Sequence, residues 1–287
     1  RWGGWSKSVS AALSRFVFSI ALPALLFHMM SGFSKLPPVD ARLLVAFFGG
    51  CLIVFFLGRL VALTLFKLDG VSQSVFALGG IFSNNVLLGI PLAKSILGDA
   101  ALPAVALVLV FNALILWTLV TVSVEWARHG SFSPSGFART ARSVLTNPIV
   151  AAILAGALFG MLDQNLPAIV EAPLALMAQI AAPLSLIVVG MGLAEYGIRE
   201  GWRQSVAISV LKLVAQPLVV WGLARALGLQ PLETQVAVLL SSLAVGVNVY
   251  LMSRHFKTLE SPVAASIVLT TALSALTTPL ALSLIGA

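Results

Sequence analysis

The stretch SNNVLLGIP, residues 83 to 91, places two adjacent asparagines in an apolar segment, with VFALGG shortly before it and LAKSIL directly after it. Gly89 and Pro91 follow Asn84 and Asn85 within two turns. Proline has no N–H and its ring crowds the carbonyl four residues earlier, and glycine loosens a helix. The stretch therefore predicts an interrupted helix that brings polar groups into apolar surroundings.

The composition places the whole chain in the membrane class. Hydrophobic residues make up 59% of it, charged residues 9%, and the mean hydropathy is +1.04. A bilayer core of about 30 Å needs roughly 20 apolar residues per helix. Stretches of this kind are found at 11–33, 41–66, 71–97, 100–124, 144–162, 173–193, 204–227, 235–253 and 262–285. We therefore expect an all-α, polytopic membrane protein embedded in a lipid bilayer.

The remaining residues exclude several functions. The loops are too short for an aqueous catalytic or sensor module. The single cysteine, Cys51, lies inside the second span, so a disulfide framework and a cysteine metal site are both excluded. The basic residues are scattered singly between spans, which does not suit nucleic acid. We expect no cofactor, no metal site and no enzymatic activity, because the spans hold no cluster of titratable residues at one depth.

The basic residues also predict the orientation. Assigning alternate loops to alternate faces puts most of them on one side: Arg1, Lys7, Arg15, Arg59, Lys67, Arg128, Arg139, Arg142, Arg199, Arg203, Arg254 and Lys257. The other side holds Lys35, Arg42, Lys94 and Arg225. By the positive-inside rule the richer face is cytoplasmic. We predict a multi-pass protein of the bacterial cytoplasmic (inner) membrane with its C-terminus outside.

Short segments recur in the same order in the two halves of the chain. IALPALL (20–26) resembles IAAPLSL (180–186), NVLL (85–88) matches NVYL (248–251), and PAVALVLVFNA (103–113) parallels PVAASIVLTTA (262–272). The paired spans cross in opposite directions, which indicates inverted repeats, a common design of secondary transporters. We predict a first repeat at 1–124, with four of five helices visible, and a second at 144–287 with five. The helix equivalent to 144–162 is expected to precede this sequence.

The repeats place two interrupted helices at one depth. Asn84 lies about 20 Å into its span, near the midplane, and Asn248 lies at a similar depth in the span that enters from the other face. Free backbone groups at this depth must be buried in protein or line an aqueous cavity. The N-termini of the second half-helices would meet at the crossing and favour an anion, with a carboxylate as the natural ligand. The alternative is that the asparagine side chains only form hydrogen bonds between neighbouring helices and bind no ligand.

NNVLLGIP followed by LAKSILGD, GVNVYLM (246–252) and FVFSIALPALLF (16–27) resemble the auxin efflux carrier family. Its bacterial members include permeases proposed for malonate and other small organic acids, and its plant members are the PIN-type auxin exporters. The resemblance extends over the whole chain. It implies two inverted five-helix repeats with crossed broken helices, as in bile-acid symporters, and the first helix absent from this chain.

The resemblance also implies a division of labour. Residues 11–33 and 144–193 would form a scaffold, which in the plant relatives makes a homodimer, and residues 41–124 and 204–285 would form a transport part. The family's crossover asparagine and proline match Asn84 and Pro91. The second repeat has Ala244 where the family usually has proline, so with only Gly246 to loosen it we expect a weaker interruption there. The predicted substrate site is completed by Ser83, Asn85, Gly246 and Asn248, and its hinges are Gly89, Pro91 and Ala244.

Lys212 is predicted to lie deep in a span, about 12 Å from the cytoplasmic face. It could neutralise the substrate carboxylate, or stabilise the carbonyl ends at the crossing, where related folds hold a sodium ion. Alternatively, its long stem could snorkel to the cytoplasmic interface. Arg59 lies at a comparable depth in the second span, where we expect its side chain to snorkel to the interface. Further candidates to line the path or support the site are Asn112, Gln179, Gln216, Thr270 and Thr271.

These observations predict a secondary carrier that moves a small organic anion by alternating access. One alternative is a structural or regulatory membrane protein without transport activity. A membrane-embedded enzyme is the least supported, since no His/Asp/Glu or Cys/His cluster is present. The substrate, the direction of transport and the coupling ion are left open by the sequence.

Overall fold

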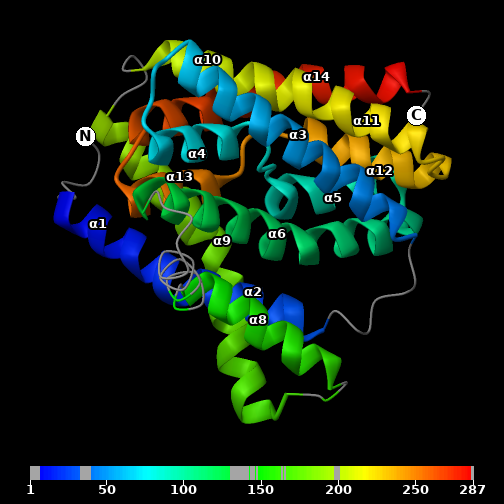
Figure 1. The fold of residues 1–287 in the computed structure, drawn as a ribbon. Helices are drawn as coiled ribbons and strands as arrows, with labels where there is room; N and C mark the ends of the chain where they lie inside the picture. The colour runs from blue at the N-terminus through cyan, green and yellow to red at the C-terminus, as the bar shows by residue number, and fades with distance from the viewer. Residues whose placement is uncertain are drawn as a thin grey trace.

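Long helices that lie side by side make up the fold (Figure 1). The computed structural model describes residues 7–32, 40–129, 142, 146, 148–162, 164, 166–196 and 201–285. Its elements are α1 (Lys7–Phe16), η1 (Val17–Ala21), α2 (Leu22–Ser31), α3 (Arg42–Thr64), α4 (Gly70–Gly79), η3 (Asn85–Gly89), α5 (Ile90–Leu97), η4 (Asp99–Ala101), α6 (Leu102–His129), α8 (Pro148–Met161), α9 (Ala168–Tyr196), α10 (Trp202–Val210), η5 (Leu211–Ala215), α11 (Gln216–Ala226), α12 (Pro231–Ser242), α13 (Val247–Phe256) and α14 (Glu260–Leu284).

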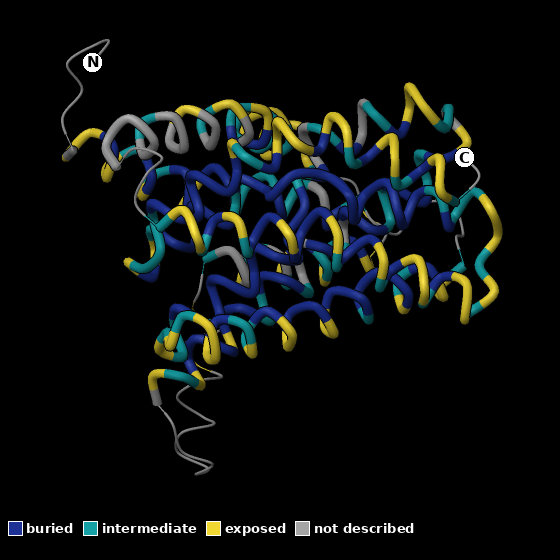
Figure 2. Tube along the Cα trace, turned by 90° about the horizontal axis from the view of Figure 1, so that it is seen from above, coloured by how far each residue is buried: buried dark blue, intermediate teal, exposed yellow. Residues whose placement is uncertain are grey.

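Membrane character is visible in both length and exposure. Four described segments are long and apolar enough to cross a bilayer: Ser8–His28, Arg42–Thr64, Trp202–Ala226 and Glu260–Leu284. Large apolar side chains such as Phe56 (65% exposed) and Leu276 (74%) face outward, as lipid-facing residues do. Figure 2 shows buried positions running through the interior and exposed positions along the outer sides of the helices. The predicted all-helical membrane class is confirmed.

The helices form two groups. The helix of α1, η1 and α2 packs with α8 and α9, and α2 and α8 lie at the lower side of Figure 1. The larger upper group consists of α3–α6 with α10–α14, and α9 also contacts α13 and α14 of this group. Close backbone approach holds the upper group together: a Cβ on Gly50 of α3 would lie 2.5 Å from Val220 Cγ2 of α11, and one on Gly58 would lie 3.0 Å from Ala77 Cα of α4. Small residues at such contacts are typical of membrane helices.

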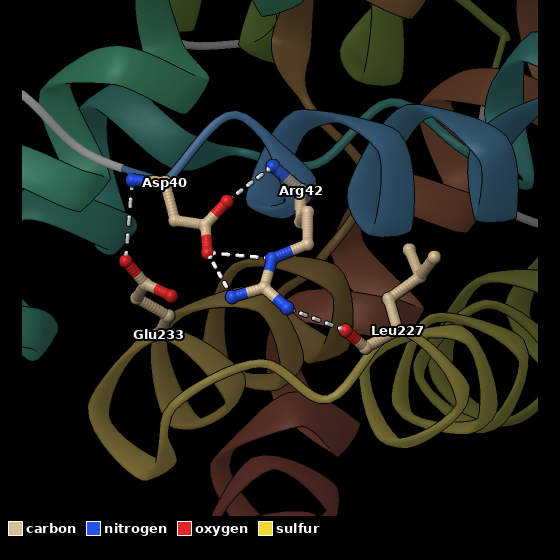
Figure 3. Close-up of polar contacts among 4 residues, drawn as sticks. All are labelled: Asp40, Arg42, Leu227 and Glu233. Atoms are coloured by element: carbon tan, nitrogen blue, oxygen red, sulfur yellow. Dashed lines mark hydrogen bonds and ion pairs between the residues drawn. The ribbon is translucent and has the colours of Figure 1, made fainter.

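An exposed polar cluster ties α3 to α11 and α12 at one end of the upper group (Figure 3). The Arg42 side chain pairs with the Asp40 carboxylate and donates from Nη1 to the Leu227 carbonyl at 3.1 Å. The Asp40 backbone N–H lies 3.4 Å from Glu233 Oε1. Hydrogen bonding from the Arg42 side chain holds the pKa of Asp40 below its ordinary value.

Candidate functional site

Two helices of the upper group are interrupted in the middle. The first ends as α4 at Gly79 and resumes at Asn85 as η3, which continues into α5. The second ends as α12 at Ser242 and resumes at Val247 as α13. Leu243 and Gly246, which flank the second gap, are extended, with ψ of 163° and 143°. Each interrupted helix therefore presents free backbone groups within the buried core.

The two gaps pair with each other. Ser83 and Val245 form an isolated antiparallel β-bridge. Its two hydrogen bonds run from Asn84 N to Ala244 O (2.9 Å) and from Gly246 N to Phe82 O (2.8 Å). Each unwound segment thus supplies hydrogen-bond donors and acceptors for the other. These buried backbone groups are therefore paired, as buried backbone groups in a membrane protein must be.

The second interruption is as complete as the first, so the expectation of a weaker break was wrong. Ala244 stands where a proline was expected, yet α12 still ends. Side chains hold the gap open instead: Thr278 Oγ1 donates to Ser242 O (3.0 Å), and Val245 N donates to Thr270 Oγ1 (3.0 Å). Both threonines lie on one face of α14. Thr270 was a sequence candidate, and the spacing Thr270, Ser274, Thr278 is a signal that also points to Thr278.

Pro91 does not lie in the gap. It follows the gap, in the first turn of α5, directly after the π-helical turns of η3. All three π-helical segments in the described part of the chain end two residues before a proline, namely Pro23, Pro91 and Pro217. A proline removes one donor and crowds the carbonyl four residues earlier, which favours a locally widened helix. The interruption predicted between Gly79 and Pro91 therefore occupies residues 80–84, the N-terminal part of that stretch.

Lys212 is fully buried in η5, and its ammonium donates to the Ser241 carbonyl at 2.5 Å. This carbonyl belongs to the last turn of α12, where the helix dipole is negative and the carbonyls lack helical partners. The snorkelling alternative is contradicted, because the side chain has no exposed surface. Of the sequence alternatives, the contact fits stabilisation of the carbonyl end at the crossing.

Gln216, one helical turn after Lys212, forms a hydrogen bond to the first gap. Its Nε2 donates to the Ile81 carbonyl at 2.8 Å and lies 3.3 Å from Cys51 Sγ. Ile81 lies in the stretch where α4 has ended, so its carbonyl has no helical partner. Lys212 and Gln216 lie about 6 Å apart along one helix, so a single segment supports both gaps.

Several buried polar atoms beside the crossing have no hydrogen-bond partner. Asn85 is 2% exposed and both its side-chain amide atoms are unpaired, as is the Oγ of Ser83, which is also 2% exposed. Neighbouring α6 adds unpaired buried atoms at Asn112 Oδ1, Trp117 Nε1, Thr118 Oγ1 and Thr121 Oγ1. Buried polar groups are normally paired. This concentration of unpaired polar atoms makes the crossing the candidate site for a polar ligand.

The other predicted site residues lie around the same crossing. Asn84 and Asn248 are half-buried, at the beginnings of η3 and α13. Gly89 and Gly246 are buried, and a Cβ on Gly246 would lie 2.9 Å from Ser83 O. No side chain caps the N-terminus of α13. Val249 N donates to Gly246 O (3.0 Å), which leaves the N–H groups of Val247 and Asn248 as the donors available to a ligand.

An aromatic cluster that sequence reasoning missed borders the crossing. Trp117 makes edge contacts with Phe82 (6.1 Å between ring centroids) and with Phe18 of η1 (5.9 Å). Phe18 also stacks on His255 of α13 at 4.2 Å. Phe18 therefore joins the lower helix group directly to α13 and, through Trp117 of α6, to Phe82 beside the first gap. No three His, Cys, Asp or Glu residues within the described ranges gather as a metal site.

Comparison with known proteins identifies the family of the chain. The family described as "Membrane transport protein" matches residues 1–135 and 137–282. The chain belongs to this family. It is 28% identical to the "Putative malonate transporter" of Rhizobium meliloti (strain 1021) over 268 residues, covering 92% of this chain and 83% of the relative. It is 23% identical to an uncharacterized transporter of Methanocaldococcus jannaschii over 283 residues, covering 92% and 86%. The chain is thus a transporter rather than an enzyme, as the sequence predicted.

Proposed function

We propose that this protein is a secondary carrier that binds a small organic anion, a carboxylate, at the crossing of its two interrupted helices. The observation that supports this most is the pairing of the gaps beside the unpaired amide of Asn85. The ends of η3 and α13 provide partial positive charge and free N–H donors, which suit a carboxylate. Asn84 and Asn248 would add amide donors from the two sides.

Lys212 has a different role in this proposal from direct substrate binding. Its ammonium is already engaged by the Ser241 carbonyl. We infer that it is a built-in cation that stabilises the end of α12, in the kind of place where a free cation would otherwise be held by carbonyl oxygens. On this basis transport needs no sodium ion at the crossing.

The proposed mechanism is alternating access between two inverted repeats, 1–124 and 144–287. An antiparallel bridge has local two-fold symmetry, and NVLL and NVYL begin within one residue of the restarts of their helices, which supports the repeat. The lower helix group would be the scaffold and the upper group the transport part. The contacts of Phe18 with Trp117 and His255 would then break and re-form in each cycle. A homodimer through the scaffold belongs to the same proposal.

Malonate and related short dicarboxylates are the first substrates to test, since one relative's name refers to malonate. Purified protein in liposomes should show saturable uptake and counterflow of a labelled carboxylate, which distinguishes a carrier from a channel. Asn84→Ala and Asn85→Ala should abolish it, while the exposed control Gln164→Ala should not. If no carboxylate is moved or bound and Asn84→Ala changes nothing, the site assignment fails.

The alternative of a transport-inactive membrane protein makes a different prediction. Such a protein would have no reason to keep an unpaired, buried amide beside two paired gaps. It would show no thermal stabilisation by any carboxylate, whereas a carrier is stabilised by its ligand by mass action.

A further inference from the structure

A concave site lies on the outer side of the upper helix group. It is an apolar groove of about 460 Å³ between η5–α11, α12 and α14. Its lining residues are Leu213, Val214, Pro217, Leu218, Trp221, Val238, Thr277, Leu280, Ala281, Leu284 and Ile285. The Thr277 hydroxyl and the Trp221 indole N–H are the two polar side-chain groups among them. The groove is therefore unsuited to a free carboxylate.

The groove faces the lipid phase. Its rims belong to Trp202–Ala226 and Glu260–Leu284, two segments long enough to cross a membrane. The rim side chains are widely exposed: Leu218 at 56%, Leu280 at 59% and Leu284 at 73%. A hollow of this size in a hydrocarbon environment is filled by hydrocarbon, because an empty one loses all dispersion contacts along its walls.

A charged residue lies at the end of the groove. Val214, Leu218, Trp221 and Arg225 recur at helical spacing on one face of the segment, so Arg225 lies about 6 Å beyond Trp221 along α11. Arg225 is exposed, and within the described ranges its side chain makes no ion pair or hydrogen bond. By contrast Arg42, at the same end of the group, is engaged by Asp40 and Leu227 (Figure 3). A tryptophan beneath a free arginine is typical of a membrane interface.

We propose that this groove binds one acyl chain of an anionic phospholipid, whose phosphate pairs with Arg225. The chain would run from the membrane surface past Trp221 toward Leu213 and Val238. An arginine and a phosphate form charge-assisted hydrogen bonds, and a net negative headgroup adds attraction. The lipid belongs to the leaflet at the C-terminal ends of α11 and α14, which is the outer one in the orientation predicted from the basic residues.

The inner end of the groove gives this lipid a structural consequence. Leu213 directly follows Lys212, and Val238 lies one turn before Ser241, the acceptor of the Lys212 ammonium. An acyl chain at this end packs behind the contact that stabilises the second gap. Bound lipid should therefore stabilise the fold.

Trp221 is a built-in probe of the site. The protein is reconstituted in vesicles with increasing fractions of brominated phosphatidylglycerol or brominated phosphatidylcholine, and tryptophan fluorescence is recorded. The same titration of Trp221→Phe gives the background of the other tryptophans. We expect the Trp221 component to be quenched at a several-fold lower fraction of phosphatidylglycerol than of phosphatidylcholine.

Two variants and a control distinguish specific lipid binding in the groove from non-specific contact with the surrounding bilayer lipid. Arg225→Gln should bring the two quenching curves together, and Ala281→Phe, which fills the groove, should reduce quenching by both lipids. Arg203→Gln, at the opposite end of the same helix and beside Trp202, should leave the curves unchanged. Identical curves for both lipids in the parent protein, or an unchanged preference in Arg225→Gln, would overturn the proposal. Unreduced quenching in Ala281→Phe would also overturn it.

Discussion

Ser83 and Val245 lie in different interrupted helices and pair as an antiparallel bridge, so each gap is completed by the other. Neither segment could be unwound alone at this depth without leaving buried backbone groups unpaired. Because the bridge depends on close backbone approach, the residues beside it are sensitive to small changes.

Gly246→Ala should damage the crossing. Its backbone angles suit any residue, but the added Cβ would lie 2.9 Å from Ser83 O and 3.0 Å from Phe82 Cδ1. We expect a loss of about 1–3 kcal/mol in stability, as for overpacking in a core, together with loss of transport. Thermal unfolding in detergent and liposome uptake measure both. The matched control is Gly222→Ala, where a Cβ meets nothing within 4 Å; equal effects of the two changes would contradict the argument.

Thr270→Val should destabilise the second gap. The change preserves shape but removes the hydroxyl that accepts the Val245 N–H, leaving a buried donor unpaired. We expect a cost of about 1–2 kcal/mol, seen as a lower melting temperature. Thr271→Val next to it removes a hydroxyl that bonds only within its own helix, to the Ile267 carbonyl. If both variants have the melting temperature of the parent protein, Thr270 does not stabilise the gap.

Lys212→Met should impair transport more than folding. Ser241 O loses its donor, but the cost of burying an ammonium is removed as well, so the two effects on stability partly offset each other. Without a cation at the end of α12, we expect transport to fall by roughly tenfold or more. Lys94→Met, at an exposed lysine of α5, serves as the control. Unchanged uptake by Lys212→Met, or parent uptake that requires sodium, would refute the role given to this lysine.

Acid should weaken the contact at the start of α3. The pKa of Asp40 is lowered in the folded protein, chiefly by the hydrogen bond from the Arg42 side chain. Its stabilising contribution is therefore complete above the unfolded pKa of about 3.9 and is lost as the pH falls through the lower folded value. The difference in melting temperature between the parent and Asp40→Asn should be small, since the pair is exposed, and should vanish at low pH. A difference that stays constant down to pH 2 would show that the carboxylate is not its source.

Periodicity and composition were enough to predict the helices, because apolar length alone selects membrane spans. The interruption near Asn84 was also predictable, since two asparagines and three glycines cannot form a regular lipid-facing helix. The interruption at Leu243–Gly246 was underestimated because its cause is not local. It depends on Thr270, Thr278 and Lys212, which lie far away in the sequence and meet the gap only after folding.

Pro91 shows that a strong local signal in the sequence can also be misplaced. The residue is a reliable local signal, and it was assigned to the break, but it lies beyond the gap and follows a widened turn instead. Sequence alone cannot distinguish these outcomes, because the choice depends on which carbonyls find partners elsewhere. Trp117 was missed for a similar reason: a single tryptophan in an apolar span gives no sign that its N–H is left unpaired.

The central claim is that the crossing binds a carboxylate through Asn85 and the helix ends beside it. Equilibrium binding of radiolabelled malonate and other short carboxylates to the purified protein tests this most directly, with Asn85→Ala and Gln164→Ala measured in parallel. The account predicts saturable binding of at least one carboxylate, its loss in Asn85→Ala and its retention in Gln164→Ala. Binding of equal strength in Asn85→Ala and the parent protein would contradict it.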